Sequence, residues 1–173
     1  VLQDNNFEVF FDPENTAHQY FEMEINAINT TWDLFLPKPY RDRGAALNSW
    51  ESNVRTAVKI QGTLNNSSDK DKSWTVEMAF PFKDLNVKTP PTGKKLWRLN
   101  FSRVEWYTDV VNGKYERKKD ANGKRLPEHN WVWSPQGPIN MHFPERWGYL
   151  TFNTEEQGTS QQFEMPYSEK QRN

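Results

Sequence analysis

Two alternating segments carry polar side chains that can bind the hydroxyl groups of a sugar. In residues 21–27 and 97–102, apolar positions alternate with polar ones, so the polar side chains of each predicted strand share one face. They are Glu22, Glu24 and Asn26 in the first segment and Arg98, Asn100 and Ser102 in the second, with Trp106 further along. Planar carboxylate, amide and guanidinium groups offer fixed sets of donors and acceptors. If both segments lie in one sheet, we expect an open polar face with an aromatic rim that binds a glycan.

That polar face has a second interpretation. Glutamate and arginine side chains commonly pair across neighbouring strands on a solvated outer face. The sequence alone leaves both interpretations open.

Trp131 and Trp133 form a second candidate binding surface. They stand on either side of Val132, so in a strand both rings point to the same face. With His129 nearby, they can form a platform on which sugar rings stack. The alternative is that one or both rings fill the core beneath a long loop.

Acidic residues near the start of the chain are candidate ligands for calcium. Asp4 and Asp12 flank Glu8, and Ca²⁺ accepts about 6–8 oxygen ligands. However, no loop has the dense Asp and Asn spacing of a calcium-binding hand. The other interpretation is that Asp12 forms a turn before Pro13 and that Asp4 is simply exposed.

The composition excludes several other kinds of site. The 173 residues include no cysteine, so disulfides and thiolate sites are excluded. The histidines, His18, His129 and His142, show no zinc-binding spacing. A net charge of −1 gives no electrostatic case for nucleic acid, and no run of about 18 apolar residues predicts a membrane span.

A hydrophobic period of two predicts the elements that position these residues. It occurs in residues 7–11, 21–27, 32–36, 54–60, 74–80, 97–101 and 147–152. Turn-forming pairs such as Asp12-Pro13 and Asn112-Gly113 separate the runs. About seven strands of this kind predict an all-β, antiparallel β-sandwich over residues 1–153, each strand having one buried and one solvated face.

The remaining segments are predicted to be irregular. Residues 81–85 suit one short helical turn after a strand. Residues 37–53 and 107–146 lack a clear period and read as long loops, which in compact domains are often functional. Residues 154–173 are polar and are expected to form a tail or a linker to another domain.

Five segments, in this order, resemble the family 9 carbohydrate-binding modules of bacteria. Their ranges are 3–12, 20–27, 62–82, 97–103 and 131–150, the last including Trp131-Val132-Trp133-Ser134-Pro135 and Phe143 to Leu150. The resemblance covers roughly residues 3–153 and rests on the ordered set. It implies a jelly-roll-like β-sandwich that binds sugar, calcium in some members, and attachment to polysaccharide-degrading enzymes.

The resemblance also has residue-level consequences. Glu8 best matches a sugar-contacting carboxylate of the family. The positions that match the family's two sugar-gripping tryptophans lie near Leu2 and Met141, and neither is tryptophan here. The chain also starts almost on the family's acidic strand, so we expect a sandwich lacking its first N-terminal strands.

The sequence therefore predicts a secreted, non-catalytic binding module. We expect it to bind a plant-type polysaccharide or oligosaccharide (xylan or glucan) outside the bacterial cell, in the periplasm or at the cell surface. A glycoside hydrolase domain in the same full-length chain is the expected partner. The alternatives are a structural or interaction sandwich without sugar binding and, less favoured, a glycoside hydrolase with two catalytic carboxylates.

Overall fold

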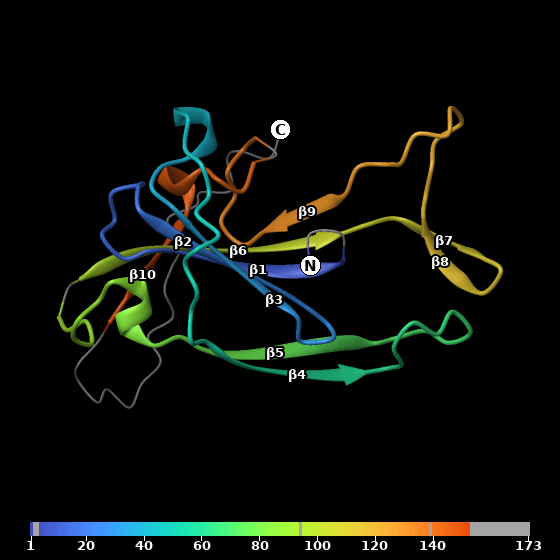
Figure 1. The fold of residues 1–173 in the computed structure, drawn as a ribbon, viewed down its shortest axis with the longest axis horizontal. Helices are drawn as coiled ribbons and strands as arrows, with labels where there is room; N and C mark the ends of the chain where they lie inside the picture. The colour runs from blue at the N-terminus through green and yellow to red at the C-terminus, as the bar shows by residue number, and fades with distance from the viewer. Residues whose placement is uncertain (2–3, 94, 139, 153–173) are drawn as a thin grey trace, which may run out of the picture.

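The computed structural model describes residues 1, 4–93, 95–138 and 140–152, and in them the chain is an all-β, antiparallel, sandwich-like fold. One sheet has six strands in the order β10-β6-β1-β2-β3, and β9 also pairs with β6 (Figure 1). Its strands are β1 (Asn6–Asp12), β2 (Tyr20–Asn26), β3 (Thr31–Leu36), β6 (Leu96–Glu105), β9 (His129–Val132) and β10 (Gly148–Thr151). The predicted tail at 154–173 lies outside the described residues.

Strand β1 is the centre of this sheet. It pairs antiparallel with β2 on one side, where Glu8 is opposite Glu24, and with β6 on the other, where Glu8 is opposite Ser102. Strand β6 is long enough for two partners along its other edge. Its first half pairs with β10 and its second half with β9.

Two hairpins complete the fold. The strands β4 (Arg55–Gln61) and β5 (Ser73–Ala79) form a two-stranded sheet, which lies beneath the six-stranded sheet in Figure 1. The strands β7 (Thr108–Val111) and β8 (Lys114–Arg117) form another. Asn112 and Gly113 join them with φ angles of 52° and 75°. Positive φ at both central residues is what a tight two-residue hairpin turn requires, and Asn-Gly favours it.

Aromatic rings fill the layer on the hairpin side of the six-stranded sheet. Phe11 packs against Phe80 and Trp97 against Phe82, with ring centroids 4.8 and 6.0 Å apart. Phe82 begins η2 (Phe82–Leu85), a short 3-10 turn that confirms the helical turn predicted at 81–85. The buried members of this apolar cluster are Phe21, Leu85, Val87 and Trp97.

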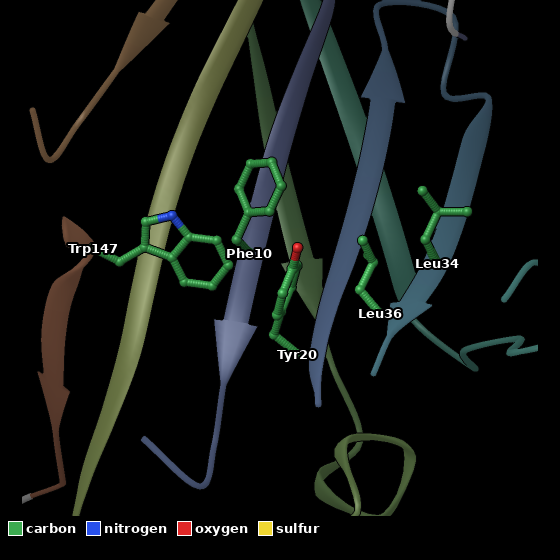
Figure 2. Close-up of a cluster of buried hydrophobic side chains, with 5 residues drawn as sticks. All are labelled: Phe10, Tyr20, Leu34, Leu36 and Trp147. Carbon is green, nitrogen blue, oxygen red and sulfur yellow. The ribbon is translucent and has the colours of Figure 1, made fainter. Parts of the chain in front are cut away.

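The second cluster lies on the opposite face of the same sheet. Its members are Phe10, Tyr20, Leu34, Leu36 and Trp147, which Figure 2 shows reaching across β1, β2 and β3. Two 3-10 turns belong to segments on this side, η1 (Tyr40–Asp42) and η3 (Pro144–Arg146). Arg41 of η1 forms an ion pair with Glu145 of η3, so the two segments are joined over this face.

Two expectations from the sequence are wrong. Residues 107–146 contain β7, β8 and β9 and are not one irregular loop. The strands also do not all have a solvated face, because every residue of β2 is buried. Its position between β1 and β3, with covering segments on both faces, explains this burial.

Candidate functional site

The polar face predicted from the sequence forms, but it is covered. Strands β2 and β6 flank β1 in one sheet, as the prediction required. Glu24 is 3% exposed and Asn100 is fully buried. The expectation that these side chains line an open surface is therefore wrong, because covering segments from distant parts of the chain seal this face.

Asn100 and Arg98 hold one of those covering segments in place. The Asn100 amide oxygen accepts the backbone N–H of Ser134 at 2.9 Å, and its nitrogen donates to the Ser134 carbonyl at 3.4 Å. Arg98 donates to the backbone carbonyls of Pro144 and Glu145 at 3.3 and 3.2 Å. Both side chains therefore form hydrogen bonds within the fold and do not present these polar atoms to a ligand.

Trp106 does not form an open rim to this face. The Arg117 guanidinium lies over its ring, 3.2 Å from the centroid. Its backbone N–H donates to the side chain of Asn5 at 2.7 Å, which ties the end of β6 to the start of the chain. The ring is half-buried and covered, so stacking on a sugar there is not supported.

Three glutamates meet at the centre of the buried face. Glu8, Glu22 and Glu24 each place a carboxylate oxygen within 4.8 Å of the others, and we call them the acidic cluster. Burial raises the pKa of Glu24 to about 8 and holds the pKa of Glu22 well above its usual range, with the neighbouring glutamates adding to both shifts. Burial also raises the pKa of Glu8. The sequence analysis did not predict that Glu22 and Glu8 lie close together, because their proximity depends on the pairing of β1 with β2.

The predicted calcium ligands Asp4 and Asp12 do not come together. Asp4 precedes β1 and accepts a hydrogen bond from Asn26 at 2.9 Å. Asp12 ends β1, where its carboxylate accepts the backbone N–H groups of Ala17 and Thr16 at 2.7 and 3.3 Å. The calcium prediction at this pair is therefore wrong: Asp12 is a buried turn residue, and the length of β1 separates it from Asp4.

The rings of β9 are exposed, as a binding platform requires. Trp131 is 52% exposed and Trp133 is 49% exposed. The His129 ring stacks beside Trp131, with centroids 5.5 Å apart and planes at 24°. Tyr107 lies against His129 with centroids 4.3 Å apart. We call Tyr107, His129, Trp131 and Trp133 the aromatic strip.

Packing from beneath fixes the position of Trp133. Its ring lies 5.7 Å from that of Phe101. It also lies over Gly148, where an added Cβ would stand 2.4 Å from the Trp133 ring. The absence of a side chain at Gly148 therefore leaves the space that the Trp133 ring occupies.

A charged pair lies beside the aromatic strip. Arg103 and Glu105 of β6 pair at 2.7 Å, and both face the same side of the sheet as their register partners Trp131 and His129. The Arg103 guanidinium is 5.7 Å from the Trp131 ring centroid. Sequence reasoning missed Tyr107, Arg103 and Glu105, because nothing local signals that β9 pairs with this end of β6.

Comparisons with known proteins give no relative. No protein-family model, curated protein or solved structure matches this chain. Among the described residues, no helix is long and apolar enough to cross a membrane. Met141, which matches a family sugar-gripping position, packs against the core cluster of Figure 2, and Leu2 lies outside the described residues.

Proposed function

We propose that this chain is a non-catalytic module that binds a polysaccharide or oligosaccharide along the aromatic strip. One observation carries the proposal: the rings of Tyr107, His129 and Trp131 contact one another and yet remain exposed, those of Tyr107 and Trp131 by about half. Apolar faces of sugar rings stack on such surfaces. The Arg103–Glu105 pair next to the rings supplies planar donors and acceptors for hydroxyl groups.

The shape of the strip favours binding along a chain. His129, Trp131 and Trp133 are two residues apart, and alternate residues of a strand are spaced by roughly 6.6–6.8 Å. Because the His129 and Trp131 rings stack on each other, they form one stacking position, and Trp133 offers a second position to an extended glycan. Among the described residues, no ring contact adds a second row of rings that would clamp a chain end, so we propose internal binding to a xylan or glucan.

The resemblance to family 9 carbohydrate-binding modules supports the ligand class. It also favours a secreted bacterial protein linked to a glycoside hydrolase. The site proposed here differs from the family site that the resemblance implies, because the positions near Glu8 and Glu24 are buried. Under this proposal the chain binds glycan on the opposite face of its sheet.

A hydrolase is less well supported. Glycosidases place two carboxyl groups roughly 5–9.5 Å apart, on either side of the glycosidic bond that they cleave. The acidic cluster has closely spaced carboxylates, but burial keeps a polysaccharide from reaching them. An interaction module that binds a protein through the same rings remains the competing function.

Affinity electrophoresis with a Trp131→Ala variant tests the proposal. In gels containing soluble xylan or β-glucan, we expect slowed migration of the parent chain and normal migration of the variant, with no reducing sugar released. Tyr149→Ala is the matched control, since Tyr149 is 53% exposed but lies on the other face of the sheet, opposite Arg98. Unretarded parent chain across a panel of glycans would contradict sugar binding, and equal loss in both variants would contradict the strip.

A further inference from the structure

The acidic cluster carries three carboxylates that pair with no lysine or arginine of the described residues. Glu8, Glu22 and Glu24 are 5%, 4% and 3% exposed. A buried charge without a partner is costly, so such carboxylates either hold protons or surround a cation.

The positive charges of the described residues do not neutralise the acidic cluster. The N-terminal ammonium of Val1 lowers the pKa of Glu24, which burial and Glu8 still keep at about 8. The histidine beside Glu22 does not supply a charge either. His142 places Nε2 3.8 Å from a Glu22 oxygen, too far for a hydrogen bond. Burial lowers the pKa of His142 to about 4, so the ring is neutral at pH 7. Its other nitrogen lies 3.0 Å from the Tyr20 hydroxyl.

Unpaired oxygen atoms around the acidic cluster are the independent sign of a ligand. Asn6 and Ser102 are each 2% exposed and lie on the same sheet face, next to Glu8 and opposite Glu8 respectively. The Asn6 amide nitrogen donates to Glu24 at 2.8 Å, but its oxygen has no hydrogen-bond partner. One oxygen each of Glu8 and Glu22 also has no hydrogen-bond partner. The Ser102 hydroxyl makes no well-aligned hydrogen bond, although it lies close enough to Glu8 to oppose the rise in its pKa.

Buried polar atoms in native proteins are almost always paired. Here four oxygen atoms without a well-aligned hydrogen bond come from β1, β2 and β6 and belong to neighbouring side chains on one face. All four can act as metal ligands, and none is a nitrogen or sulfur atom. An ion among them would satisfy several of these groups at once.

We propose that Glu8, Glu22 and Glu24, with the oxygens of Asn6 and Ser102, form a buried binding site for a divalent cation of calcium size. Oxygen ligands at about 2.3–2.6 Å place opposite ligands roughly 5 Å apart around Ca²⁺, which suits a cluster whose oxygens lie within 4.8 Å of one another. Mg²⁺, with bonds of about 2.0–2.1 Å, needs a tighter cage and prefers to keep water. The ion would join the three central strands and neutralise their shared face.

The test compares the chain with a Glu22→Gln variant, after chelator treatment and dialysis. Calorimetric titration with CaCl₂ should show one site in the parent, and CaCl₂ should raise its unfolding temperature by several degrees. Glu22→Gln should weaken calcium binding at least tenfold and abolish this rise. In chelator the variant should be at least as stable as the parent, because the change removes a carboxylate that burial disfavours.

Glu77→Gln is the matched control, since it removes the same charge from the exposed face of β5. It should keep the full calcium response. The proposal is overturned if CaCl₂ gives neither heat nor a temperature shift with the parent, or if Glu22→Gln responds as the parent does. A stronger response to MgCl₂ than to CaCl₂ would overturn the assignment to a calcium-sized ion. The aromatic strip lies on the opposite face of the sheet, so a failure of glycan binding and a failure of calcium binding can be distinguished.

Discussion

Glu8 of β1 lies directly opposite Glu24 of β2, and both side chains are buried. Like charges placed opposite each other in a sheet destabilise it. Glu22, one pair further along the same face, adds a third carboxylate. This arrangement raises the pKa values of all three carboxyl groups, so the centre of the sheet is sensitive to protonation.

The stability of the cation-free chain should fall as pH rises from 6.5 to 8. The pKa of Glu24 is about 8 in the folded chain, against an ordinary value of 4.5. Its contribution to the free energy of unfolding is therefore fully present below pH 4.5 and is lost as the pH rises to 8. Glu8 and Glu22 face Glu24 and shift in the same direction. His142 acts oppositely, because its pKa falls to about 4, but only below pH 6.5.

Urea unfolding in chelator at several pH values between 6.5 and 8 measures this effect. Glu24 alone should lower the free energy of unfolding by about 2 kcal/mol between pH 6.5 and 8, because each proton contributes about 1.4 kcal/mol per pH unit. Glu24→Gln should flatten the slope, whereas Glu77→Gln should leave it unchanged. A parent chain whose stability is constant or rises across this window would contradict the raised pKa values.

Asn100→Ala should destabilise the fold by about 2–3 kcal/mol. The change leaves the part-buried Ser134 N–H without its acceptor at 2.9 Å and opens a gap at a fully buried side chain, and an unsatisfied donor away from water carries a desolvation cost. Asn122→Ala, in an exposed turn, should change stability by less than about 0.5 kcal/mol. Urea unfolding of both variants is the measurement, and equal midpoints would contradict this role for Asn100.

Gly148→Ala should move the Trp133 ring and weaken glycan retention. The added methyl would lie 2.4 Å from the ring, which must shift outward because the backbone beneath cannot. Since the ring is half exposed, the stability cost should be about 1 kcal/mol. Tryptophan fluorescence and affinity electrophoresis report the two effects, and Gly123→Ala, at a glycine with open space around it, is a comparison for general backbone strain.

Asp12→Asn should weaken the fold without altering the calcium response. An amide keeps one acceptor for Ala17 or Thr16 but loses the negative charge near Arg98, whose Nε is 3.9 Å away. We expect a loss of about 1–2 kcal/mol in urea. A calcium-induced rise in unfolding temperature that disappears in this variant would place the metal at the end of β1 instead of in the acidic cluster.

Local sequence features predicted most of the strands correctly. The seven alternating runs correspond to β1 to β6 and β10, and Asn112-Gly113 is the turn that its residues favour. The short strands β7, β8 and β9 were missed because four residues are too few for a period to stand out. The shared face of Trp131 and Trp133 followed from their spacing, but their exposure did not.

The sequence by itself determined the strand faces: alternation put Glu22, Glu24 and Asn26 on one side of β2 and the apolar residues on the other. It also determined where the chain turns, through residues that tolerate positive φ. Only the tertiary structure decided which faces meet water. Ser134 lies 34 positions after Asn100, and Glu145 lies 47 positions after Arg98, and no local pattern encodes these contacts. Whether the second face of a strand is buried depends on segments that are distant in the sequence. For this reason the sequence correctly predicted that these polar side chains share one face and wrongly predicted that this face is exposed.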